Sequence, residues 1–397
     1  MIKKMAMFAL ILGLFITNSI VVLASSEIAN ETLDEKKIKY VVEAFFDKYE
    51  NISYDNEQTK LIEDIIELSS TEVTHKMEDR QVYSYARSYL ELVDMMLQRR
   101  KCIKELSDID LTEYNKKLSF SYNKIDINEK KAEVQVEVMK SWNYIFSPDI
   151  ISSATDDYVF CLDKESENWK ITLVKGITDT IEDDNINNMD DEISPYQKEQ
   201  YINQLKKQYS TLRKRNNNNK IGWMLSPYSY DEKTRGSSGN YNGGNASRYA
   251  LDHALNPSSD YTYFSKDCTN FISQCLYAGG IKQHVGTVYS DTCWFYKTST
   301  NRSSSWTGAN EFYRYVNSGV SKINKSNASW ESAQIGDIIQ MMSSGKAYHS
   351  LIVSGVAYSS YGRSDLLVCA HTNNRRHVSL NEYYSGSKVY HHIIGNK

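Results

Sequence analysis

The strongest constraint on this sequence is a change in the spacing of its apolar residues. Residues 34–50 place apolar side chains three and four positions apart, which is the spacing of one helix face, and residues 82–98 repeat that pattern. Between Leu118 and Leu173 the apolar residues instead alternate with polar ones, as in strands with one buried face. Helices followed by an antiparallel sheet predict an α+β domain over 28–177, for which we expect an accessory role.

The length and charge of the chain set further limits. At 397 residues it exceeds what one ordinary core accommodates, so we expect two domains. An acidic stretch, a polar helix and an asparagine tract predict a linker over 178–237, with the second domain over 238–397. The net charge of −4 offers no basic face, so we expect no nucleic-acid partner. The sequence indicates no particular oligomeric state.

The N-terminus has the pattern of an export signal. Lys3 and Lys4 precede a long apolar run, and the small residue Ala24 stands before Ser25. We therefore expect a signal peptide over 1–24, a secreted or wall-associated protein, and no membrane span after cleavage. An uncleaved anchor is the alternative, because the apolar run approaches the length that crosses a bilayer.

The six cysteines are too sparse for a disulfide-stapled scaffold, although a Cys102–Cys161 bridge stays open. None of them forms a CxxC pair, and neither a third ligand for His391 and His392 nor a phosphate-binding loop is recognisable. We expect no metal and no cofactor.

One cysteine has a position suited to catalysis. In "KDCTNFISQCLYAGG", Asp267 can cap a helix that begins at Cys268 and ends at Gly279. A thiol in the first turn lies beside unpaired N–H groups and the positive end of the helix dipole, which favour the thiolate and can bind an oxyanion. The alternative is a buried core cysteine, since Cys268 shares its face with Phe271 and Cys275.

A thiolate needs a base and an orienting group, and the C-terminal third offers both. A strand, a Ser-Gly turn and a second strand headed by His349 are followed by a third strand that ends at His371 and Asn373. Adjacent antiparallel strands can place His349 beside His371 or Asn373, facing one way. The alternative is that each histidine is a satisfied or exposed side chain; His377 we interpret as solvated.

The segments "DCTNFISQC", "GDIIQM", "HSLIVSG" and "AHTNN" together resemble the "putative amidase domain" family of exported bacterial proteins, which groups with the NlpC-type and CHAP cysteine peptidases. The resemblance covers residues 238–397 and implies an α+β, papain-like fold. It further implies Cys268 as nucleophile, His349 as base, and His371 as the third group with Asn373 in reserve. A tyrosine that donates to the substrate or the oxyanion is also implied, for which we choose Tyr263, with Tyr261 as the alternative.

These observations predict an exported cysteine hydrolase of amide bonds with a Cys-His-polar triad. Its expected substrate is peptidoglycan, cleaved as an amidase or as an endopeptidase. A peptidase or acyltransferase acting on an exported protein is one alternative. A non-catalytic protein that binds the cell wall is the other.

Overall fold

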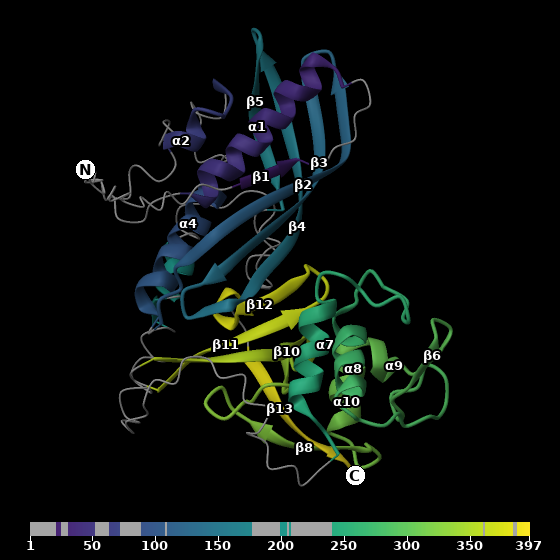
Figure 1. Ribbon diagram of the computed structural model, residues 1–397. Helices are drawn as coiled ribbons and strands as arrows, with labels where there is room; N and C mark the ends of the chain where they lie inside the picture. Colours follow the sequence, from purple (N-terminus) through teal and green to yellow (C-terminus); the bar gives the residue numbers. More distant parts are fainter. Residues whose placement is uncertain are drawn as a thin grey trace, which may run out of the picture.

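The computed structural model describes residues 21–24, 31–51, 63–71, 89–107, 109–176, 199–204, 206–207, 240–359, 362–383 and 387–397. Apart from its last four residues, the predicted signal peptide lies outside this part of the chain, as does most of the predicted linker. The described residues form two bodies, one from each half of the chain, that meet along a sheet (Figure 1). The α+β class expected for both is confirmed.

Helices and a meander of antiparallel strands make up the N-terminal body. Its elements are β1 (Val21–Ala24), α1 (Leu33–Glu50), α2 (Glu63–Ile66), α4 (Tyr89–Leu106), β2 (Glu113–Asn128), β3 (Lys131–Tyr144), β4 (Ser147–Glu165) and β5 (Asn168–Lys175). The side chain of Thr32 accepts a hydrogen bond from the Glu35 N–H and the Glu35 carboxylate accepts one from the Thr32 N–H, which starts α1 at Leu33.

Alternation along the strands explains why α1 packs where it does. Phe45 and Phe46 point from α1 onto the sheet, and their rings lie 5.3 and 5.7 Å from the ring of Phe160 on β4. On β3 the even-numbered residues from Ala132 to Val138 are buried, whereas the odd-numbered ones face outward. The helix therefore lies across the buried face of the curved sheet (Figure 1).

The C-terminal body places its helices on one side of a second run of strands (Figure 1). Its elements are α7 (Gly243–His253), α8 (Cys268–Ala278), β6 (Tyr296–Thr298), β7 (Asn301–Arg302), α9 (Ser304–Thr307), α10 (Ala309–Val316), β8 (Ile323–Ala328), β9 (Ile338–Ser343), β10 (Lys346–Ser359), β11 (Gly362–Ala370), β12 (Arg375–Ser379), η2 (Leu380–Glu382) and β13 (Ser387–Asn396). We call the face that packs on α7, α8 and α10 the helix-covered face and the opposite one the far face.

The Gly-Asp pair before β9 is structural. Gly336 has a φ of +85°, and a Cβ there would lie 2.4 Å from Cα of Gly243, so only glycine fits. The carboxylate of the fully buried Asp337 accepts hydrogen bonds from the N–H groups of Gln334 and Ile393. It thereby ties β13 to the loop in front of β9.

The sheet continues from one body into the other. Strand β4 pairs with β12 through Ser153 and Ala154, and the order of the strands runs β1-β2-β3-β4-β12-β11-β10-β9-β13-β8. Arg375 on β12 forms an ion pair of 2.5 Å with Asp156, with side chains 4% and 13% exposed. Trp142 and Tyr144 pack in the same cluster as Leu351 on the far face. The N-terminal body thus extends the sheet of the C-terminal body and packs against its far face.

His377 belongs to this junction, and the interpretation of it as solvated is wrong. Its side chain is fully buried between the hydroxyls of Ser147 and Ser354, at 3.2 and 3.0 Å. Its carbonyl accepts a hydrogen bond from Ser152. Burial, with the nearby charge of Arg376, lowers the pKa of His377 to about 3, so the ring is neutral.

The cysteines answer one further expectation. All six cysteines are thiols, so the Cys102–Cys161 bridge is not formed. Among the described residues, every helix is too short or too polar to cross a bilayer.

Candidate active site

Cys268 is the first residue of α8, as its sequence context predicts. The helix is buried through Leu276, and the Cys268 side chain is 6% exposed. Its sulfur lies 3.7 Å from the hydroxyl of Thr269, the next residue. The first-turn N–H groups of a helix have no partner four residues earlier, so the thiol lies where a negative charge is stabilised.

Asp267 does not cap this helix through its side chain, contrary to expectation. One carboxylate oxygen, Oδ1, accepts hydrogen bonds of 2.9 Å from the Phe264 N–H and from Nδ2 of Asn270. The other, Oδ2, lies 2.6 Å from Nδ1 of His371. These three groups occupy the carboxylate, so it links the preceding loop, the helix and the end of β11.

His371 is held on both sides by hydrogen bonds. Its Nε2 lies 2.8 Å from the backbone oxygen of His253, and because a carbonyl only accepts, Nε2 carries a proton. Its Nδ1 lies 2.6 Å from Oδ2 of Asp267. Phe271 of α8 stacks on the ring at 4.0 Å with an angle of 18°. The imidazole is thereby fixed against the first turn of the helix that carries Cys268.

The turn after His371 has an unusual backbone. Thr372 and Asn373 have φ values of +62° and +60°, and a β-branched residue rarely adopts this conformation. The Thr372 hydroxyl accepts a hydrogen bond of 2.9 Å from the Asp267 N–H. Such strain persists only where the surroundings enforce it and gathers at functional sites. Asn373, expected as the reserve third group, lies on this turn.

Tyr263 contacts the same turn. Its ring lies 5.5 Å from that of His371, and its hydroxyl donates to Oδ1 of Asn374 at 3.3 Å. Its side chain is 48% exposed. Burial of its inner part, with the charge of Asp267, raises the pKa of the Tyr263 hydroxyl, so it remains a donor at neutral pH. Asn374, rather than Asn373, is the asparagine that meets it.

His349 does not face Cys268, which corrects the expected side-by-side histidines. Strands β10 and β11 are adjacent and antiparallel, as predicted, but Ile352 pairs with Cys369. Paired residues share a face, so even-numbered residues of β10 lie on the same face as odd-numbered residues of β11. His349 is therefore on the far face, whereas His371 is turned toward α8.

Ser350 occupies the position expected for His349. Its hydroxyl lies 3.0 Å from that of Thr269 and accepts a hydrogen bond of 3.1 Å from Gln340. The ring of His349 instead stacks on that of Tyr383, at 6.0 Å. Burial, with the charge of Arg375, lowers the pKa of His349 to about 3.

Burial keeps two neighbouring thiols protonated. Burial raises the pKa of Cys275 well above the usual value for a thiol and that of Cys369 to about 11. Both are fully buried and therefore protonated. They are core residues, as expected for Cys275.

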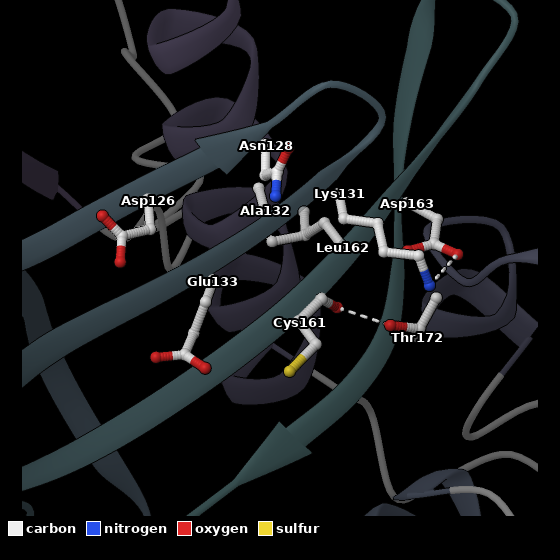
Figure 2. A pocket seen from close by; sticks show the side chains of 9 residues that line it. All are labelled: Asp126, Asn128, Lys131, Ala132, Glu133, Cys161, Leu162, Asp163 and Thr172. Carbon is white, nitrogen blue, oxygen red and sulfur yellow. Dashed lines mark hydrogen bonds and ion pairs between the residues drawn. The ribbon is translucent and has the colours of Figure 1, made fainter.

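A surface hollow lies elsewhere, on the N-terminal sheet, with a volume of about 340 Å³. Figure 2 shows the Lys131 ammonium paired with Asp163 at one end of it and the carboxylates of Asp126 and Glu133 at the other. None of its lining residues comes from the C-terminal body. Within the described ranges, no group of three or more histidine, cysteine or carboxylate side chains could hold a metal ion.

Comparison with known proteins points to the same part of the chain. Residues 240–394 match the family model described as "Putative amidase domain". The "Uncharacterized protein YjcM" of Bacillus subtilis (strain 168) is 28% identical over 151 residues. That alignment covers 35% of this chain and 32% of the relative, so the chain spans about a third of that protein's length. No solved structure matches the chain. The C-terminal body is therefore similar to an amidase-type domain, and the description of that family suggests hydrolysis of amide bonds.

Proposed function

We propose that the chain is an exported cysteine hydrolase that cleaves amide bonds in peptidoglycan. The observation that supports this most is the position of Cys268. It begins α8 inside the amidase-type region, directly after the residue that binds His371. Export is inferred from the N-terminal charge and apolar pattern, and the wall substrate from export together with the family resemblance.

The reaction begins with attack by the Cys268 thiolate on the amide carbonyl carbon. A C–S bond forms, and the carbonyl oxygen becomes an oxyanion that first-turn N–H groups and the Tyr263 hydroxyl stabilise. The C–N bond then breaks, and the leaving nitrogen takes a proton to become an amine. Water hydrolyses the thioester, which releases the carboxylic acid and restores the thiol.

In this proposal His371 is the imidazole that exchanges protons with the thiol and the leaving amine. It is fixed at the cysteine end of α8, whereas His349 lies on the far face. To accept the thiol proton, Nε2 must first lose its own proton to solvent water and turn away from the carbonyl of His253, 2.8 Å away.

The decisive experiment incubates the full chain with purified sacculi and measures new amino groups and the masses of released fragments. We expect release by the wild type and none by Cys268→Ala. His371→Asn is expected to abolish release as well, whereas His349→Asn retains it if it folds. Release by Cys268→Ala at the wild-type rate would exclude a cysteine hydrolase. If folded His349→Asn releases no amino groups while His371→Asn still releases them, the base is His349 rather than His371.

A non-catalytic wall-binding protein is the second candidate, and two observations favour it. Cys268 is only 6% exposed, and both ring nitrogens of His371 already have partners. Under this candidate the wild type and Cys268→Ala sediment equally with sacculi, and neither releases an amino group. A peptidase or acyltransferase would instead act on an exported protein and leave sacculi intact.

A further inference from the structure

Arg302, on the short strand β7, has an unusual environment for an arginine. Its guanidinium carbon lies 4.8 Å from the ring centre of Phe264 and 5.2 Å from that of Tyr289. Its Nε is buried and makes no hydrogen bond, and within the described part of the chain no carboxylate pairs with it. By contrast, Arg100 and Arg314 each reach a carboxylate at 2.8 Å.

The contact with Tyr289 is enforced by the backbone. The Tyr289 N–H donates to the carbonyl of Arg302 at 2.8 Å, which places the two side chains together. The Ser304 hydroxyl donates to the carbonyl of Tyr289 at 2.7 Å. These two bonds hold the N–H and the carbonyl of Tyr289, whose φ of +57° is a strained conformation for a bulky residue. The loop therefore holds an exposed ring against a cation.

The guanidinium also lies against the segment that leads into the candidate active site. The Phe264 N–H donates to Oδ1 of Asp267, the residue before Cys268. Lys266 of the same segment is exposed, and the N-terminus of α8 is the positive end of a helix. The carboxylate of Asp267 contacts the Phe264 N–H, the Asn270 amide and the His371 ring. Arg302 and Lys266 therefore add positive charge near the positive end of α8, whereas Asp267, Glu137 and Asp157 place negative charge near Tyr263.

We propose that Arg302 is a carboxylate-binding subsite, which selects amide substrates that carry a free carboxylate near the bond to be cleaved. Aromatic rings contact the faces of a guanidinium, so the N–H groups along its edge can still donate hydrogen bonds. A carboxylate matches that edge, because its two oxygens accept two parallel N–H bonds. This subsite deepens the proposed function, because it names a chemical feature of the substrate of the same site. Its ligand class is an acidic peptide or a peptide with a free terminal carboxylate.

The test measures binding rather than turnover, so that it stands apart from the hydrolysis assay. The full chain carrying Cys268→Ala is titrated with N-acetylmuramoyl-L-alanyl-D-glutamate and with the D-isoglutamine form, which lacks one carboxylate. A second pair, the amidated peptides acetyl-Ala-Glu-Ala and acetyl-Ala-Gln-Ala, contains no wall component. We expect the acid of at least one pair to bind on the order of tenfold more tightly than its amide.

Replacement of the arginine must remove this preference. Arg302→Gln should bind acid and amide equally, and Arg302→Lys, which keeps the charge but not the flat fork, should retain only part of the difference. Arg314→Gln is the matched control, because that arginine already pairs with Asp291 and Glu311. Equal binding of acid and amide in both pairs by the parent, or an unchanged preference in folded Arg302→Gln and Arg302→Lys, overturns the subsite. If the wild type does not digest sacculi but the Cys268→Ala protein still binds the acid more tightly than the amide, only the proposed function is rejected.

Discussion

Oδ2 of Asp267 lies 2.6 Å from Nδ1 of His371, and both side chains are only 1% exposed. The two residues come from the start of α8 and the end of β11, so this contact joins the helix of Cys268 to the sheet. Because the Asp267 N–H also donates to the Thr372 hydroxyl, the strained turn is held to the helix by two bonds from one residue. The geometry of the candidate site depends on this link.

Asp267→Asn should therefore weaken the fold as well as the site. The substitution replaces an anionic acceptor of three hydrogen bonds by an amide, and loss of charge-assisted bonds in a buried place costs about 2 kcal/mol. Urea unfolding should show a fall of that size. Asp260→Asn, at an exposed position in the same loop, is the control and should be neutral. Equal stability of the two variants would contradict the structural role of the pair.

Alkylation should distinguish Cys268 from the other thiols. Iodoacetamide reacts with the thiolate, and burial keeps Cys275 and Cys369 protonated. At neutral pH, peptide mass analysis should find Cys268 modified first. A Cys161→Ser background removes a thiol that is partly exposed. If Cys268 in the folded protein reacts no faster than Cys275, it is not activated.

Stability should fall as the pH drops below about 6.5. Burial lowers the pKa of His349, His377 and His391 to about 3 each, from the usual histidine value of 6.5. Between these values the unfolded chain binds protons that the folded one excludes, so the stabilisation is complete above pH 6.5 and is lost toward pH 3. Each of the three contributes a slope of up to about 1.4 kcal/mol per pH unit.

Urea unfolding at pH 7 and pH 5 measures this slope. His377→Gln should reduce it by one such contribution, whatever its effect on stability at pH 7. His284→Gln, at a partly exposed position, is the matched control and should leave the slope unchanged. A wild-type slope that is flat over this range would show that the three rings are not excluded from protonation.

Asp156→Asn should disturb the candidate site from the other body. The substitution removes the carboxylate that Arg375 contacts at the β4–β12 junction, and breaking a buried ion pair costs about 3 kcal/mol. Hydrogen exchange at the 371–379 backbone should accelerate. Asp163→Asn, whose ion pair with Lys131 is exposed, is the control. Unchanged exchange in folded Asp156→Asn would show that the N-terminal body does not hold this turn.

Much of the local structure follows from local chemistry. The capping box at Thr32 and Glu35, the glycines after Ala278 and the Ser-Gly turn before β10 are short-range patterns, so the corresponding helices and hairpin could be predicted. The place of Cys268 at a helix start was predictable for the same reason. The partner of Asp267 was not, because an acid before a helix most often caps it, and its actual partner is more than a hundred residues away.

By itself the sequence determined the α+β class, the first-turn position of Cys268 and the adjacency of the two histidine strands, because helix and strand periods and turn residues act over a few positions. Only the tertiary structure decided which imidazole meets the helix. Whether two strand residues share a face depends on register, and the pairing of Ile352 with Cys369 turns His349 away and His371 inward. The tertiary structure also decided that β4 pairs with β12 of the C-terminal body, since pairing between distant strands is set by packing of the whole chain.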